Sequence, residues 1–286
     1  MGRWFGRHYL LFALVVAAGL VPPISPTQAE VTIPTVLITG SNRGIGLEFV
    51  RQYTADNWRA IATCRRPDAA TELNALAAEH ANIVVEQLDV NDHARVDVLA
   101  RQYADRPIDV LLNNAAYLGD IGPQTLGQID YQLYTDILAT NAIAPIKISE
   151  AFLPHVAASE KKTIVIMGSA AGSNGLLSRG NALYAYRASK AAVHISAHRM
   201  AQDLAEQGIR VALINPGVVD TRGILDLKPG DPVPDAFKPL LPLIESGQLK
   251  LIRPAESVAG IRNIIENLTA EQASRFINYD GVEIPW

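Results

Sequence analysis

Short β-branched apolar runs alternate along the chain, from residue 35 onward, with longer segments in which apolar residues recur at helical spacing. Such runs predict buried strands, and the longer segments predict helices that cover the sheet. The short loops favour a single α/β domain with a parallel, doubly wound sheet of the Rossmann type. The predicted strands are residues 35–39, 59–63, 83–88, 110–112, 163–167, 210–214 and 276–278, and the predicted helices are 69–78, 93–103, 130–140, 146–156 and 255–267, with two more beginning near residues 47 and 186.

The first 29 residues depart from this alternation. Two arginines precede an uninterrupted apolar run at residues 10–21, and three prolines and then Ala29 follow it. This order is typical of a secretory signal, and the run is short for a membrane-spanning helix. We therefore expect residues 1–29 to be a signal peptide, cleaved after Ala29, or an N-terminal anchor, and residues 30–286 to be the domain. The protein is expected to be exported (periplasmic) or membrane-tethered, with membrane contact through residues 10–21 only. The alternative is a cytoplasmic protein.

Residues 218–249 form a second exception. Five prolines stand among apolar residues there and exclude one long helix. Such an insertion after the last major strand predicts either a lid over a substrate or a segment that packs against the domain or a partner.

The turn after the first predicted strand is rich in glycine and leads directly into a helix. It reads T-G-S-N-R-G-I-G at residues 39–46. Glycine lets the backbone approach a pyrophosphate, and a helix N-terminus supplies free N–H groups and the positive end of a dipole. Glycines also serve ordinary tight turns. The position between strand and helix is what indicates a dinucleotide site here.

Arginines, and no acidic residue, follow the second predicted strand. In NAD-binding folds an acid near this position accepts a hydrogen bond from the ribose 2′-OH. Here Arg65 and Arg66 occupy the position, and Arg43 lies in the glycine turn. Because arginine forks onto phosphate oxygens, we expect NADP(H) rather than NAD(H), with Arg43 and Arg65 on the 2′-phosphate. The alternative is that these arginines are simply solvated.

Tyr186 and Lys190 are four residues apart in a predicted helix, so they lie on one face, a turn apart. A neighbouring cation favours the phenolate, and we expect Lys190 to lower the pKa of Tyr186. A phenol tuned in this way exchanges a proton with a substrate oxygen. Ser169 follows a different strand, at the carboxyl edge of the sheet where ligands bind in such folds.

Composition narrows the class of protein. With 286 residues, 49% of them hydrophobic, and a net charge of −4, the chain is globular and unlike a general nucleic-acid binder. The single cysteine excludes an internal disulfide framework. His194 and His198 lie one turn apart, but no third ligand accompanies them, so we expect no metal site. We expect His155 at the solvated surface, with His80 and His93.

Together these features resemble the short-chain dehydrogenase/reductase family. The matches extend from Thr35 to Trp286 and comprise the glycine turn, Asp89, N-N-A-A at 113–116, Asn141, Ser169, Y-R-A-S-K at 186–190 and P-G at 216–217. Four runs are similar to C-factor-like, sniffer-type carbonyl reductases: N-R-G-I-G-L-E, A-T-C-R-R-P, Y-A-Y-R-A-S-K-A-A and the closing Y-D-G-V-E-I-P-W.

The resemblance implies a role for each matched position. Tyr186 is implied as the acid–base group, Lys190 as its partner and ribose ligand, Ser169 as the donor to the substrate oxygen and Asn141 as the holder of a relay water. The implied cofactor contacts are Gly40, Asn42, Arg43, Gly44, Ile45, Gly46, Arg65, Asp89, Val90, Asn113, Ala115, Tyr186, Lys190, Pro216, Gly217 and Val219. Ser169 precedes Tyr186 by 17 positions, which is longer than the family's common spacing, so Ser173 and Ser178 are rivals for the serine role.

The expected function is an NADP(H)-dependent oxidoreductase that transfers hydride between the nicotinamide and a carbonyl or alcohol substrate. One alternative is a dinucleotide-binding sensor or signalling protein of C-factor type with little turnover. Another is a sugar-nucleotide epimerase, which the glycine spacing and the lack of a large C-terminal domain disfavour. The resemblance also implies a homodimer or homotetramer that pairs through the helices at 146–156 and 186–204.

Overall fold

A seven-stranded parallel sheet organises the protein. The computed structural model describes residues 1–2, 33–176, 182–228, 230–233, 238, 241–247 and 249–286, so residues 3–29 of the expected signal peptide or anchor lie outside the described residues. Ile33–Trp286 forms one compact unit. The strand order is β3-β2-β1-β4-β5-β6-β9, with β1 Thr35–Thr39, β2 Arg59–Cys64, β3 Ile83–Gln87, β4 Val110–Asn113, β5 Thr163–Met167, β6 Arg210–Asn215 and β9 Phe276–Asn278. This is the doubly wound order of the Rossmann fold, and the predicted fold class is confirmed.

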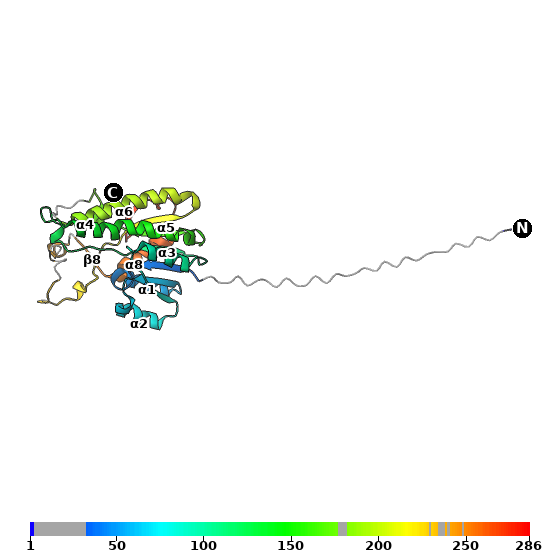
Figure 1. Ribbon diagram of the computed structural model, residues 1–286, viewed down its shortest axis with the longest axis horizontal. Helices are drawn as coiled ribbons and strands as arrows, with labels where there is room; N and C mark the ends of the chain where they lie inside the picture. Colours follow the sequence, from blue (N-terminus) through cyan, green and yellow to red (C-terminus); the bar gives the residue numbers. More distant parts are fainter. Residues whose placement is uncertain (3–32, 177–181, 229, 234–237, 239–240, 248) are drawn as a thin grey trace. The chain divides into compact units, whose positions relative to one another are not determined.

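Both faces of the sheet are covered by helices. Leu37 of β1 packs with Phe152 and Val193 on one face, whereas its neighbours Val36 and Ile38 pack with Phe49 on the other. Helices α3 (His93–Gln102), α5 (Ala144–Ala157) and α6 (Tyr184–Leu204) supply the first layer, and α1 (Gly44–Ala55), α2 (Thr71–Glu79) and α8 (Pro254–Glu266) supply the second (Figure 1). Burial on both sides explains why the central strands read as continuous apolar runs.

The helix that carries Asn141 runs without a break, contrary to the prediction of separate helices on either side of Pro145. Helix α4 (Tyr131–Leu138) continues through one π turn (Ala139–Ile143) into α5. Pro145 has no N–H to donate to the carbonyl four residues earlier, which is that of Asn141. The widened turn accommodates this proline, so the helix bulges at Asn141 instead of ending.

The proline-rich segment after β6 forms a small separate sheet. Strand β7 (Val218–Val219) pairs in parallel with β8 (Leu251–Ile252). Asp220, directly after β7, accepts hydrogen bonds from the main-chain N–H groups of Arg222, Ile224 and Leu225. The described part of the segment adds the short helices η6 (Ile224–Asp226) and α7 (Leu241–Glu245). Its role as a lid stays a prediction.

The position of one histidine, His155, differs from the prediction made from the sequence. His155 is buried, its Nε2 lies 3.0 Å from the Ala100 carbonyl oxygen, and its ring packs on Phe152. The expectation that it is solvated is wrong, because the last turn of α5 faces α3 rather than solvent. Within the described part of the chain, no helix is long and apolar enough to cross a membrane.

Candidate active site

The loops at the carboxyl edge of the sheet bring together the residues that the sequence singles out. Ser169 follows β5, Asn113 ends β4, and the glycine turn follows β1. Helix α6 begins at Tyr184 and packs against the 3-10 turn η4 (Ala170–Gly172), which immediately follows Ser169. The loop that carries Ser169 therefore lies against α6, and the glycine turn and Asn113 lie at the same carboxyl edge of the sheet.

Tyr186, Ser169 and Lys190 form the centre of the site. Ser169 is the side-chain neighbour of the Tyr186 phenol that favours its ionised form and so acts to lower its pKa. Lys190 is buried; its Nζ donates to the Met167 carbonyl oxygen at 2.8 Å and lies 5.9 Å from the centre of the Tyr186 ring. The predicted helical spacing thus places the ammonium beside the phenol.

The protonation of this pair differs from the expectation. Burial raises the pKa of Tyr186 above its ordinary value, and the hydrogen bond with Ser169 only partly opposes this effect. Burial also lowers the pKa of Lys190 to about 8. The net shift of the Tyr186 pKa is therefore upward, opposite to the expected lowering, because desolvation outweighs the effects that favour the phenolate. At neutral pH the phenol carries its proton.

Asn141 links the loop after β4 to α6. Its Oδ1 accepts from the Tyr117 N–H at 2.7 Å, and its Nδ2 donates to the Tyr117 carbonyl at 2.8 Å and to Ser189 Oγ at 3.0 Å. Ser189 Oγ in turn donates to the Tyr186 carbonyl at 2.7 Å. Both polar atoms of the Asn141 side chain are used to hold these two segments together. A relay water would therefore have to bind to the main-chain carbonyl oxygen of Asn141.

Gln124, which sequence reasoning missed, holds the start of α6. Its side chain is 1% exposed, and its Oε1 accepts from the Tyr186 N–H at 2.9 Å. Its Nε2 donates to the carbonyls of Leu118 and Asp120 at 2.7 and 2.9 Å. The residue before α6, Leu183, has no capping side chain, and Gln124 supplies that cap from 62 residues away. No local pattern could reveal it.

Ser173 and Ser178 are the alternatives to Ser169 as donor to the substrate oxygen, and the structure excludes Ser173. Ser173 is buried, its Oγ donates to the Pro285 carbonyl at 2.5 Å, and it also accepts from the Leu176 N–H. Ser178 lies outside the described residues. Ser169 is the serine that contacts the Tyr186 hydroxyl.

The glycine turn has the geometry of a phosphate cradle. Gly40 and Gly44 have positive φ angles of 70° and 57°, a region that suits glycine. A Cβ on Gly46 would lie 2.6 Å from the side-chain nitrogen of Asn114, which donates to the Gly40 carbonyl. Arg43, at the N-cap of α1, makes no capping bond and no acidic side chain occupies the first turn. The first N–H groups of α1 therefore suit a pyrophosphate.

The remaining predicted cofactor residues line the same edge. Ser41 N–H donates to the Thr63 carbonyl, which brings the exposed Arg43 turn beside the end of β2, where Arg65 is exposed. Neither guanidinium forms an ion pair within the described residues. Asn113 Oδ1 is buried without a hydrogen-bond partner among them. Exposed cations beside the glycine turn fit a 2′-phosphate.

The other predicted contacts follow β1, β3, β4 and β6 along the chain. Asp89 is half-buried and Val90 is buried directly after β3; Asn42 is exposed, and Ile45 and Ala115 are half-buried. Gly217 has a φ of 80°, and a Cβ there would lie 2.9 Å from the Tyr279 ring. Pro216 is held by a hydrogen bond from Ser257 Oγ to its carbonyl, and Val219 is buried. The sequence features thus share one edge of the sheet.

The chain belongs to the short chain dehydrogenase family, whose sequence profile matches residues 34–229. Its fold resembles the NADPH-bound carbonyl reductase from chicken fatty liver, with 30% identity, a TM-score of 0.73, and coverage of 89% of this chain and 99% of that one. It also resembles the carbonyl reductase Sniffer of D. melanogaster, with 27% identity, a TM-score of 0.74 and coverage of 89% and 100%. Among curated relatives, the C-signal of Myxococcus xanthus is 32% identical over 180 residues, or 63% of this chain and 93% of its own length. The predicted resemblance to the sniffer and C-factor group is confirmed.

Proposed function

We propose that this protein is an NADP(H)-dependent carbonyl reductase in which Tyr186 is the general acid. The observation that carries the proposal is the contact between the hydroxyls of Tyr186 and Ser169, with Lys190 buried beside them. Similarity to two carbonyl reductases, one of them bound to NADPH, supports both the reaction class and the cofactor.

The residues present fit the cofactor. The glycine turn and the open N-terminus of α1 suit its pyrophosphate, and Arg43 and Arg65 suit a 2′-phosphate. We assign the pyrophosphate to Gly40, Gly44, Ile45 and Gly46, the adenosine side to Asp89, Val90, Asn113 and Ala115, and the nicotinamide side to Lys190, Pro216, Gly217 and Val219. When bound, NADPH supplies the hydride.

The chain's own residues supply the proton and the orientation. The Ser169 and Tyr186 hydroxyls would both donate to the substrate carbonyl oxygen, which fixes the carbon for attack and stabilises the charge that develops on the oxygen. Tyr186 then transfers its proton to that oxygen. Tyr186 would then regain a proton through a water bound to the main-chain carbonyl oxygen of Asn141. Lys190 would hold the nicotinamide ribose and stabilise the transient phenolate.

A protonated Tyr186 is the form that carbonyl reduction requires. A raised pKa keeps the phenol protonated at neutral pH, and a general acid is needed when a carbonyl becomes an alcohol. Alcohol oxidation requires the opposite form, a phenolate that accepts a proton. We therefore propose that Tyr186 acts as the acid when a carbonyl is reduced.

A screen of NADPH oxidation tests the proposal. The full chain is mixed with NADPH and a panel of aldehydes, ketones and quinones, and loss of the reduced nicotinamide absorbance is followed. Turnover of at least one carbonyl class, with NADPH preferred over NADH, is expected. Tight NADPH binding with no turnover of any carbonyl would contradict the proposal.

A dinucleotide-binding signalling protein is the second candidate function. Similarity to the C-signal of Myxococcus xanthus favours it. Both functions need the cofactor-binding turn, but only the enzyme needs a proton donor at the centre of the site. Binding of NADPH without turnover in the screen described above would favour the sensor.

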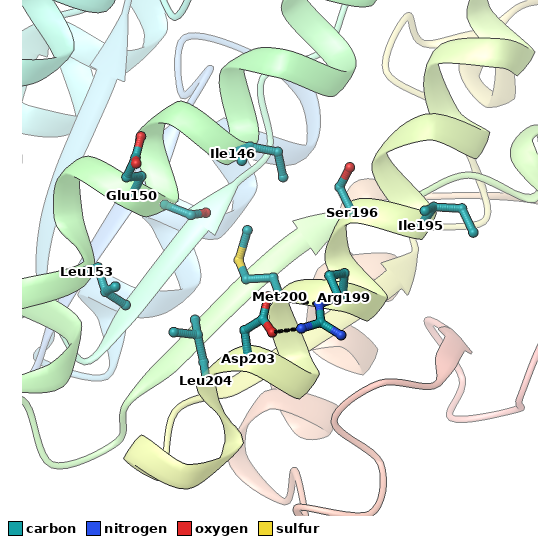
Figure 2. Close-up of a pocket in the computed structure, with 10 residues that line it drawn as sticks. Ile146, Glu150, Leu153, Ile195, Ser196, Arg199, Met200, Asp203 and Leu204 are labelled. Carbon is teal, nitrogen blue, oxygen red and sulfur yellow. Dashed lines mark hydrogen bonds and ion pairs between the residues drawn. The ribbon is translucent and has the colours of Figure 1, made fainter.

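We further propose that two copies pair through α5 and α6. A cavity of about 550 Å³ lies between these helices (Figure 2). Ile146, Leu153, Ile195 and Met200 line it, and Ile195 is 70% exposed. Helix pairing of this kind would bury these apolar side chains against their copies, in a homodimer or as one contact of a homotetramer.

The location of the protein is a separate proposal that rests on the sequence of residues 1–29. We propose that this segment exports the protein or tethers it to a membrane. Mass spectrometry of the mature N-terminus after cell fractionation tests it: a protein that begins at Glu30 outside the cytoplasm is expected for export. Intact Met1 in the soluble cytoplasmic fraction would contradict the proposal without affecting the enzymatic one.

A further inference from the structure

The loop that carries Ser169 is held by hydrogen bonds from its successive main-chain N–H groups. Gly168 N–H donates to the Ile214 carbonyl at 2.8 Å, and Ala170 N–H donates to Asn215 Oδ1 at 3.0 Å. Between them, Ser169 N–H donates at 3.2 Å to Nε2 of His194. The acceptors on either side come from strand β6, whereas the acceptor for Ser169 itself is a side chain of α6, the helix that also carries Tyr186.

Close contacts at glycines show how tightly this loop is fitted. A Cβ on Gly168 would lie 3.0 Å from His194 Nε2 and 2.9 Å from the Phe276 ring. A Cβ on Gly172 would lie 2.7 Å from the main chain of Lys190. Any other residue would push the loop away from α6, so these two glycines permit the contact that His194 makes.

His194 is suited to act as a permanent acceptor. Because a main-chain N–H can only donate, Nε2 must be unprotonated, and the proton of the neutral ring is on Nδ1. The side chain is 2% exposed. Burial lowers the pKa of His194 to about 3, and the charge of Lys190, one turn earlier on the same helix, adds to the lowering. The imidazole therefore remains neutral throughout the working pH range.

Aromatic rings from the C-terminal part of the chain enclose His194. The Phe276 ring lies 4.4 Å and the Trp286 ring 6.3 Å from the imidazole centre. The last residues also hold the far end of the serine loop, because the Pro285 carbonyl accepts from Ser173 Oγ and the Trp286 carbonyl accepts from Gly175 N–H at 2.8 Å. One side of His194 thus faces the serine loop and the other faces the end of the chain.

We propose that His194 is a positioning residue for the reaction: its neutral imidazole fixes the Ser169 main chain to the helix of Tyr186, and Trp286 holds the imidazole in place. The inference rests on the proposed function, because it assigns His194 the task of keeping the two hydroxyl donors in register. A displacement of about 1 Å between such groups costs on the order of 10²-fold in rate. His194 is buried and would act only through the main chain of Ser169.

Two substitutions separate the acceptor from the packing. His194→Phe keeps a buried ring against Phe276 and Trp286 but leaves the Ser169 N–H without its acceptor. His194→Gln restores an acceptor oxygen near the place of Nε2. We expect His194→Phe to lower kcat at least tenfold with the Kd for NADPH unchanged, and His194→Gln to recover most of the loss. His198→Phe is the matched control. His198 lies one turn further along α6, its ring centre is 5.2 Å from that of Trp286, and its Nδ1 lies 3.1 Å from the Ser274 carbonyl oxygen rather than near Ser169. The kcat of this variant should stay within about twofold of the original.

Equal loss in the Phe and Gln variants, or full activity in His194→Phe, would overturn the inference. A measurement that needs no turnover separates this failure from failure of the proposed function. In protein labelled with ¹⁵N-histidine, the inference requires one neutral Nδ1–H imidazole that does not titrate between pH 8 and pH 5 and whose signal shifts in Trp286→Ala. A His194 that titrates near its ordinary pKa would overturn the inference even if carbonyl turnover is found.

Discussion

At the scale of single residues, the site combines chemistry with a cost in stability. Lys190 is 3% exposed and carries a pKa lowered to about 8, because burial penalises its charge. A depression of this size corresponds to a penalty of up to about 3 kcal/mol while the ammonium remains charged. A buried ammonium beside a phenol is retained at the expense of stability, which is common for catalytic groups.

Replacing Lys190 should therefore separate stability from activity. We expect Lys190→Met to be more stable than the original protein at pH 7 by about 1–2 kcal/mol, since the penalty exceeds the lost hydrogen bond to Met167, and to have almost no turnover. The penalty is complete below pH 8, shrinks as the native protein releases the proton, and vanishes near 10.5, the ordinary pKa of lysine. Denaturant unfolding at pH 7 and pH 10 measures it. If the difference in unfolding free energy between Lys190→Met and the original protein is the same at pH 7 and at pH 10, this account is wrong.

Arg65 carries the choice of cofactor in the proposed function. Arg65→Asp removes a guanidinium from the end of β2 and adds repulsion toward a 2′-phosphate, so we expect the KM for NADPH to rise at least tenfold and that for NADH to change little. Arg101→Asp, an exposed substitution on α3, controls for the change of net charge. An unchanged ratio of the two KM values would refute the assignment of Arg65.

At the scale of elements, the glycine turn tolerates no side chain at Gly46. Gly46→Ala would place a methyl group against Asn114 and the Gly40 carbonyl, whereas Gly122→Ala meets no atom within 4 Å. We expect Gly46→Ala to weaken NADPH binding at least tenfold and to lower the Tm, and Gly122→Ala to leave both near their original values. Fluorescence titration with NADPH and thermal unfolding provide the comparison. A Gly46→Ala variant with original affinity would mean that the turn is not the cradle.

The elements that the sequence predicted well are those that have a local signal. Strands 163–167 and 276–278 match β5 and β9 exactly, because a buried strand is a short apolar run with turn residues at its ends. The π turn at Asn141 was missed because Pro145 has two outcomes, a helix end or a bulge, and tertiary packing selects between them. The parallel, doubly wound class of the sheet followed from the strand–helix alternation.

The parts of the site that the sequence could not reveal depend on contacts between distant segments. Gln124 reaches Tyr186 across 62 positions, and His194 reaches Ser169 across 25. His194 was considered only as half of a metal pair, since its spacing to His198 is a local pattern and its contact with Ser169 is not. The pKa of Tyr186 also depends on burial, which the Tyr186–Lys190 spacing does not encode.

At the scale of the whole molecule, the proposed pairing of two copies uses the cavity between α5 and α6 (Figure 2). Ile195→Glu places a charge at the centre of the proposed contact, so we expect it to convert a dimer or tetramer into a smaller species in light scattering. Val98→Glu, an exposed substitution on α3, should leave the assembly unchanged. If the original protein is already a monomer at micromolar concentration, pairing through this face is wrong.

The central claim is that Tyr186 gives its proton to the substrate, and one comparison tests it most directly. NADPH binding and carbonyl turnover are measured for the full chain, for Tyr186→Phe and for Tyr184→Phe, whose ring is 43% exposed two residues earlier on α6. Because Tyr186→Phe removes only the proton donor, NADPH should bind within about twofold of the original affinity while kcat falls by about 10²–10⁴-fold, and Tyr184→Phe should retain most of its turnover. A Tyr186→Phe variant that turns over at the original rate, or a greater loss in Tyr184→Phe, would contradict the account.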